Sequence, residues 1–131
     1  MDAQFNVLAV LVASGAAMLL GGLWYSPLLF ESRWRRLVSK REDQETSNPA
    51  IVYGGAFLLI LLGAAVFHAF LGPDPELGFA LGAGLGAGIA WAAGSIWISY
   101  LFEGRAGGLY LINGGYHTAQ YILFGLIFGL L

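Results

Sequence analysis

The chain has 131 residues, of which 58% are hydrophobic and 11% are charged, and its formal net charge at pH 7 is −2. A soluble domain of this size cannot bury so much apolar surface, so a lipid bilayer is the expected solvent. The lack of cysteine excludes disulfides, thiolate metal sites and thiol nucleophiles. No nucleic-acid partner is expected.

Four segments are long enough to cross a hydrocarbon core of roughly 30 Å, which takes about 20 helical residues. They are Phe5–Trp24, Ala50–Leu71, Leu77–Phe102 and Leu109–Leu131. Their continuous apolar runs favour helices over a β-barrel, whose strands would be shorter and would alternate strictly. The predicted fold class is therefore all-α: a four-transmembrane-helix bundle, forming a single membrane domain over residues 1–131.

A short amphipathic helix is expected between the first two spans, over residues 27–40, with Ser26 and Pro27 at its start. Its apolar and basic residues fall on different faces, so it should lie in the membrane interface. An anchor that fixes orientation is the first interpretation, and a surface for a lipid or a partner is the alternative. The predicted interfacial anchor residues are Trp24, Tyr25, Trp34, Arg33, Arg36 and Lys40.

The charges predict an orientation. All six Lys and Arg residues lie in the connections after the first and third spans, whereas the opposite side carries only Asp2, Asp74 and Glu76. Because cytoplasmic loops are enriched in Lys and Arg, both termini should face away from the cytoplasm. The first apolar run exceeds the core of a signal peptide, so a cleaved signal is not expected.

The sequence also repeats itself. The stretch GGLWYSPLLFESR (Gly21–Arg33) matches GSIWISYLFEGR (Gly94–Arg105), and VYGGAF (Val52–Phe57) matches INGGYH (Ile112–His117). The pattern predicts a direct duplication of a helical hairpin, with the copies related by a pseudo-twofold axis along the membrane normal.

Small residues recur at every fourth position in the first and third spans. Helices in lipid associate by close backbone approach across such rows. We expect these two helices to cross there, with a second row on the third span left for the fourth helix or another protomer. The rows are Ala9, Ala13, Ala17 and Gly21; Gly78, Gly82, Gly86, Ala90 and Gly94; and Ala80, Gly84, Gly88 and Ala92. A homo-oligomer is expected, a dimer by preference.

Polar side chains gather on the fourth span, within an arc of about 100°. Such a stripe must face protein or water. Either these groups bond across helices, to Ser95, Ser99 or Tyr100, or they line a polar cavity open to the cytoplasmic side, in which His117 would titrate. The predicted candidate polar site is Asn113, His117, Gln120, Tyr110, Tyr121 and Ser99.

A secondary candidate pair is His68 with Asn6, at the outer end of the second span. Counting helical rise, His68 and His117 lie roughly 27 Å and roughly 14 Å from the inner ends, so one iron cannot take both as axial ligands. Charged residues are confined to the ends of the spans. No carboxylate-driven export, catalytic residue, metal site or cofactor is therefore predicted. Trp91 is expected to pack against the Gly-rich helix.

The stretch GGLWYSPLLFESRW (Gly21–Trp34) resembles the signature of a bacterial family of small four-helix membrane proteins, domain of unknown function 1761. In that family a Trp-Tyr-Ser-Pro ends the first helix and a Phe and a Trp follow. IWISYLFEGR and LYLINGGYH (Leu109–His117) resemble the family too, so the likeness spans nearly the whole chain. The resemblance implies a bacterial inner-membrane location and the four-helix count, but no activity, substrate or catalytic residue.

Three functional hypotheses follow. The first is a homo-oligomeric channel-like or transporter-like protein, in which the stripe of the fourth span lines a path for a small polar solute or ion. The second is a non-catalytic accessory or scaffold subunit that binds a larger membrane complex through its small-residue rows and basic helix. The third is binding of a lipid, quinone or pigment against the aromatic residues. A bound lipid is compatible with all three.

Overall fold

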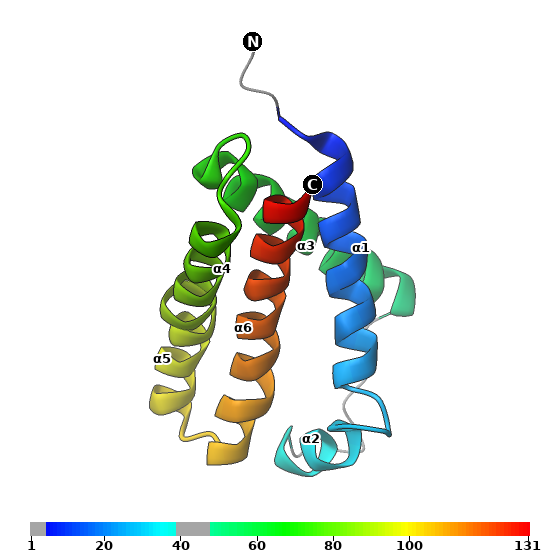
Figure 1. Ribbon diagram of the computed structural model, residues 1–131. Coiled ribbons are helices and arrows are strands. Elements are labelled where there is room, and N and C mark those ends of the chain that lie inside the picture. The colour runs from blue at the N-terminus through cyan, green and yellow to red at the C-terminus, as the bar shows by residue number, and fades with distance from the viewer. Residues whose placement is uncertain (1–4, 39–47) are drawn as a thin grey trace.

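The computed structural model describes residues 5–38 and 48–131, and every regular element in these ranges is a helix (Figure 1). The prediction of an all-α fold is confirmed. The elements are α1 (Val7–Trp24), α2 (Glu31–Val38), α3 (Pro49–Leu71), α4 (Leu77–Gly86), the π-helix η1 (Ala87–Ala93), α5 (Gly94–Glu103) and α6 (Gly107–Leu130).

Three helices are long and apolar enough to cross a membrane: Val7–Trp24, Pro49–Leu71 and Leu77–Glu103, the last of which joins α4, η1 and α5. These are the features of a membrane protein. The helix α6 has 24 residues and thus the length of a span. Its polar side chains lower its mean hydropathy, and it falls outside this set.

The ends of the helices follow from local chemistry. The Asn48 side chain accepts a hydrogen bond from the Ala50 N–H (2.8 Å) ahead of Pro49, and Gly72 ends α3 with a φ of 79°. The helix α2 begins at Glu31, later than the predicted start at Pro27. The difference arises because residues 26–30 form turns, in which the Leu29 N–H donates to the Ser26 carbonyl (3.0 Å).

Within the fold, α6 is the central helix. It lies between α1 on one side and α4 with η1 on the other, while α3 runs obliquely behind and packs mainly against α1 (Figure 1). A duplicated hairpin with twofold symmetry would give α3 and α6 equivalent neighbours. The neighbours differ, so the packing does not follow the repeat in the sequence.

The expectation that the first and third spans cross at their small-residue rows is wrong, because α6 separates them. The second row of the third span makes the close contact instead. A Cβ atom built on Gly84 would meet the backbone carbonyl of Tyr121, and one on Gly88 would lie 2.7 Å from the Cα of Thr118. Conversely, a Cβ on Gly125 of α6 would meet the Ala80 carbonyl. Backbone therefore packs directly on backbone along this seam.

The two ends of the fold differ. We call the end that carries α2 the α2 end, and the end where α1 begins and α6 finishes the terminal end (Figure 1). The terminal end contains the apolar core, whose buried members are Ala9, Val10, Ala13, Ala17, Ala64, Phe67, Ala87, Phe124 and Phe128. The small residues of α1 thus pack into this core with α3 and α6.

Candidate functional site

A cleft of about 710 Å³ lies between α1, α3 and α6. We call it the aromatic cleft. One wall is formed by α1 and the turns after it, through Met18, Gly21, Gly22, Tyr25, Ser26, Pro27 and Glu31. The facing wall belongs to α3, through Val52, Tyr53, Ala56, Leu59 and Ile60, and α6 adds Tyr116 and His117.

The helices α1 and α3 share buried core residues toward the terminal end. There, Ala13 and Ala64 are fully buried in the shared core. Farther along, a Cβ atom built on Gly22 of α1, or on Gly54 or Gly55 of α3, would have no atom within 4 Å. The two helices are therefore separated toward the α2 end, and the gap is lined by rings.

The predicted stripe on α6 divides into three parts. Asn113 forms the first part and bridges two helices: the Tyr25 hydroxyl of the α1 end donates to its Oδ1 (2.6 Å), and its Nδ2 donates to the Tyr100 hydroxyl of α5 (2.7 Å). Burial raises the pKa of the Tyr25 hydroxyl well above its ordinary value, with smaller contributions from Tyr100 and Tyr116. Tyr25 therefore keeps its proton and its role as donor.

His117 and Gln120 form the second part. The His117 Nδ1 lies 2.9 Å from the side-chain oxygen Oε1 of Gln120. Gln120 is buried, with 4% of its surface exposed, whereas His117 is half-buried and lines the aromatic cleft. The buried amide thus fixes the imidazole at the edge of the cleft.

The remaining stripe residues lie elsewhere. The Tyr110 ring packs edge-on against Tyr100, with 5.4 Å between ring centroids. The Tyr121 ring packs against the Phe124 ring of the apolar core, with 5.0 Å between ring centroids. Ser99 is exposed on α5 and takes no part in the Asn113 bridge. The structure therefore brings His117 and Gln120 together at the cleft and places Tyr110, Tyr121 and Ser99 outside it.

The repeated tryptophans hold α6 from two sides. The Trp24 Nε1–H donates to the Ile112 carbonyl (2.8 Å), and the Trp97 Nε1–H donates to the Tyr110 carbonyl (2.9 Å). Close approach needs glycine on α6: a Cβ on Gly114 would meet the Trp97 indole. Trp24 was predicted as an interfacial anchor, but its indole nitrogen bonds inside the protein.

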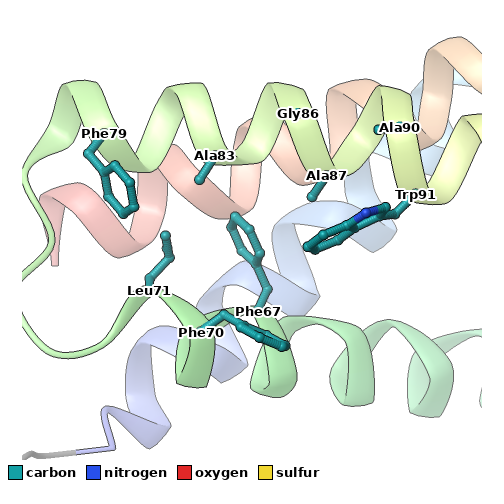
Figure 2. Close-up of a pocket in the computed structure, with 9 residues that line it drawn as sticks. All are labelled: Phe67, Phe70, Leu71, Phe79, Ala83, Gly86, Ala87, Ala90 and Trp91. Atoms are coloured by element: carbon teal, nitrogen blue, oxygen red, sulfur yellow. The ribbon is translucent and has the colours of Figure 1, made fainter.

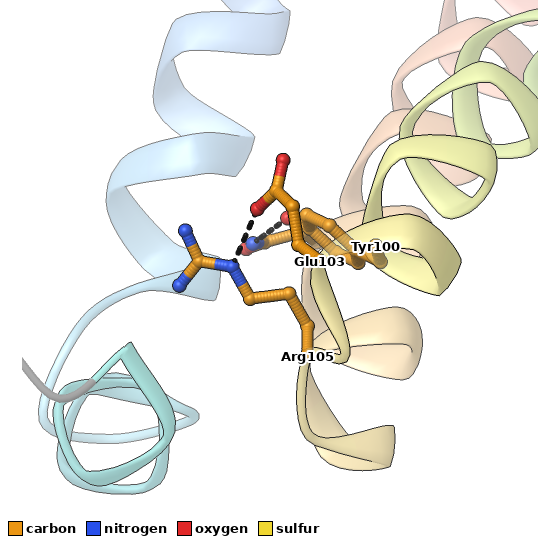
Figure 3. A network of polar contacts seen from close by, with 4 residues as sticks. Tyr100, Glu103 and Arg105 are labelled. Carbon is orange, nitrogen blue, oxygen red and sulfur yellow. Dashed lines mark hydrogen bonds and ion pairs between the residues drawn. The ribbon is translucent and has the colours of Figure 1, made fainter.

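The other predicted anchors lie around the α2 end. Trp34 packs edge-on against Tyr25, with 5.8 Å between centroids. Arg33 and Arg36 are exposed on α2, and Lys40 lies outside the described residues. At the end of α5, Arg105 folds back onto Glu103 (Nε to Oε1, 2.8 Å), close to Tyr100 (Figure 3). This last pair is exposed, so it contributes little to stability.

Tyr116 is the main cleft residue that the sequence did not single out. Its hydroxyl donates to the Ala17 carbonyl (2.9 Å), and its ring lies edge-on to Tyr25, with 5.8 Å between centroids. The internal repeat could have pointed to this residue, because Tyr116 of INGGYH occupies the position of Ala56 in VYGGAF. Both residues line the cleft, Ala56 from α3 and Tyr116 from α6.

The secondary pair lies at the terminal end, far along the fold from α2. The backbone N–H of Asn6 donates to the His68 Nε2 (2.9 Å). The His68 ring lies between Phe5 and Phe128, at 4.8 Å from each centroid. Its Nδ1 is buried without a hydrogen-bond partner in the part of the chain that the structure describes. These contacts tie the start of α1 to α3.

A second, apolar groove of about 450 Å³ runs between α3 and α4 with η1 (Figure 2). Phe70, Phe79 and Trp91 stand along it, and an adjoining hollow of about 250 Å³ shares Phe70 and Trp91. Trp91 is 66% exposed, so it does not pack against the Gly-rich helix as expected. It projects from η1, where the Gly94 N–H bonds to the Ile89 carbonyl in the π-helical pattern.

The Asn113 bridge gives a first prediction. Asn113→Leu should lower the free energy of unfolding by about 1–3 kcal/mol, because two partly buried tyrosine hydroxyls lose their partner. The measurement is unfolding in SDS-containing mixed micelles, followed by circular dichroism. Combining it with Tyr25→Phe and Tyr100→Phe should restore part of the loss, since no hydroxyl is then left unpaired. A triple variant that is less stable than Asn113→Leu alone would contradict the bridge.

Comparisons with known proteins give a family but no activity. A family model described as "Protein of unknown function (DUF1761)" matches residues 8–129. No curated protein and no solved structure matches the chain. Among the described residues, no group of three or more His, Asp or Glu side chains lies close enough to hold a metal ion. The aromatic cleft is therefore the feature from which a function can be argued.

Proposed function

Since the chain belongs to the family of unknown function DUF1761, we propose its function from geometry: it binds a small polar solute or ion in the aromatic cleft and moves it across a membrane. The observation that supports this is the position of His117, held by buried Gln120 at the edge of a cleft that Tyr25 and Glu31 also line. Polar groups at an apolar, concave surface are typical of ligand sites.

We further propose that α6 is a fourth span. Its polar side chains are covered by α1 on one side and α5 on the other, as the bonds of Asn113 illustrate. The basic residues of α2 lie at the α2 end, as does the turn between α5 and α6, which contains Arg105 (Figure 1). By the charge rule this end faces the cytoplasm of a bacterial inner membrane, with both termini outside and α2 in the interface. The repeat in the sequence favours an origin by duplication.

The cleft is closed toward the terminal end. Ile60 lines the cleft and also packs against the core cluster that contains Phe67, Phe124 and Phe128. The cleft is closed by apolar residues toward the terminal end and has its polar residues toward the α2 end. This arrangement is more typical of a carrier, which alternates between two conformations, than of a permanently open channel. Transport would require the seal around Phe124 to open.

The apolar groove beside Trp91 favours a second candidate, in which the chain uses this groove to bind a lipid or to pack against another copy or a larger complex. A Cβ atom built on Gly82 or Gly86 of α4 would have no atom within 4 Å, so a small-residue row stays open for a homodimer. Native mass spectrometry that finds neither bound lipid nor a dimer would exclude lipid binding and dimerisation through this groove.

Obstructing the cleft tests the transport proposal. Ala56→Trp places an indole in the cleft wall and should reduce solute flux at least severalfold, while the protein still folds because the cleft has room for the ring. The measurement is stopped-flow light scattering of liposomes under gradients of glycerol, urea or potassium chloride. Flux is compared with that of protein-free liposomes.

Leu58→Trp is the matched control. Leu58 lies on the same helix, is 65% exposed and does not line the cleft. It should leave flux unchanged. Equal flux through both variants would contradict transport through the cleft, and no flux above that of protein-free liposomes would exclude these three solutes as its cargo.

A further inference from the structure

Three of the four hydroxyl groups that line the aromatic cleft already donate their protons to the protein. The Tyr25 hydroxyl donates to Asn113, and the Tyr116 hydroxyl donates to a carbonyl of α1. The Ser26 hydroxyl donates to the Leu23 carbonyl (2.7 Å). Each hydroxyl oxygen keeps acceptor capacity after its proton is used. Tyr25 and Tyr116 therefore offer lone pairs to a ligand, whereas the Ser26 oxygen already accepts from the Leu28 N–H (3.2 Å).

His117 follows the same pattern. Its Nδ1 faces the Gln120 side-chain oxygen, which only accepts hydrogen bonds, so Nδ1 carries the proton in the neutral ring. The other ring nitrogen, Nε2, is then an acceptor. It has no hydrogen-bond partner within the described residues 5–38 and 48–131.

Among the described residues that line the cleft, Glu31 is the one carboxylate, and there is neither Lys nor Arg. Glu31 pairs with Arg35, one turn along α2, with 3.7 Å between Nε and Oε1. Arg35 has 71% of its side chain exposed, so this pair is loose and weak. Arg35 can turn to solvent when another cation approaches the carboxylate.

Among the polar groups of the lining, acceptor atoms thus outnumber free donors, and three tyrosine rings lie beside them. Ring faces attract cations, and a carboxylate adds opposite charge. We propose that the aromatic cleft binds a protonated amine, whose N–H groups pair with the Glu31 carboxylate and the His117 Nε2 while Tyr25, Tyr53 and Tyr116 surround its carbon skeleton. This inference rests on the proposed function and names the class of ligand for it.

Other ligand classes fit less well. A quinone presents carbonyl oxygens and needs donors, but three of the four tyrosine and serine hydroxyls in the cleft are already bonded. The fourth belongs to the exposed Tyr53 and has no partner among the residues that the structure describes. An anion would meet Glu31 without a lining arginine or lysine to neutralise it. The negative charge of Glu31 and the shortage of free hydrogen-bond donors therefore both favour a protonated amine over a quinone or an anion.

Binding of benzylammonium to the full-length protein in phosphatidylcholine nanodiscs, measured by isothermal titration calorimetry, tests the assignment. We expect saturable binding that is at least tenfold tighter than that of benzyl alcohol or benzoate. Benzyltrimethylammonium keeps the charge but lacks N–H groups, and it should bind more weakly than benzylammonium. Tighter binding of benzoate or benzyl alcohol would overturn the amine assignment while leaving the cleft a solute site.

Substitutions of the two members of the Glu31–Arg35 ion pair should change benzylammonium binding in opposite directions. Glu31→Gln should weaken benzylammonium binding about tenfold, because it removes a charged acceptor. Arg35→Gln should tighten it about two- to fivefold, because it removes the competing cation. A role of this pair in folding alone would shift both variants in the same direction. Glu103→Gln, outside the cleft, is the control and should change nothing.

The amine could be a soluble molecule or the headgroup of phosphatidylethanolamine. Nanodiscs that contain this lipid distinguish the two sources. Weaker apparent binding of benzylammonium there indicates that the headgroup occupies the site, and unchanged binding indicates a soluble amine. Absence of saturable benzylammonium binding in phosphatidylcholine overturns the inference; if Ala56→Trp also leaves solute flux unchanged, the proposed function fails with it.

Discussion

Gly84→Ala is expected to lower the free energy of unfolding by about 2–3 kcal/mol, the cost of overpacking a tight contact. The added Cβ would meet the Tyr121 carbonyl oxygen of α6 and would lie 3.1 Å from the Cα of Ile122. These are backbone atoms, which cannot rotate away as the end of a side chain can. The two helices must therefore separate along the whole seam, and unfolding in SDS-containing micelles measures the loss.

Gly82→Ala provides the matched control on the same helix. No atom lies within 4 Å of a Cβ built on Gly82, so the added methyl group should be neutral or slightly stabilising. Equal losses in the two variants would show that α4 and α6 do not approach each other through Gly84.

The contrast between these glycines shows what the sequence could not decide. Rows of small residues on two faces of the third span both predicted close packing, and periodicity alone assigned the wrong row to the main contact. The fourth helix was named as one of two possible partners for the second row, and the sequence did not decide between it and another protomer. Which faces meet depends on the tilt and order of the helices, which local patterns do not encode.

Helix limits were predictable for physical reasons. Apolar runs bounded by capping residues and charges gave segments whose observed limits, such as Val7–Trp24 and Pro49–Leu71, lie close to the expected ones. The π-helix η1 was not foreseen. A run of Gly and Ala has no side-chain pattern that distinguishes π from α hydrogen bonding, so the exposure of Trp91 could not be predicted either.

The candidate site was predictable in part. A polar stripe must avoid lipid, which drew attention to Asn113, His117 and Gln120, and the structure gives each of them a hydrogen-bond partner. The cleft itself depends on the separation of α1 from α3, a tertiary property. For that reason Tyr116 and Glu31, which look like an ordinary aromatic and an ordinary surface charge in the sequence, were missed.

Phe124→Ala is expected to lower the free energy of unfolding by about 3–5 kcal/mol, the range for truncating a buried phenylalanine. Phe124 is fully buried, and its ring packs against those of Tyr121 (5.0 Å between centroids) and Phe128 (6.4 Å). Leu126→Ala, on the same helix at a residue with 37% of its surface exposed, should cost about 1 kcal/mol or less. Comparable losses would contradict the assignment of Phe124 to the core.

The same variant links stability to the proposed mechanism. The cluster around Phe124 closes the aromatic cleft toward the terminal end through Ile60. If this cluster is the barrier to the solute, the folded fraction of Phe124→Ala should show faster flux than the unmodified protein, whereas Leu126→Ala should not. Destabilisation without faster flux would mean that Phe124 supports the fold but does not gate the cleft, and the barrier would then have to be sought at another part of the path.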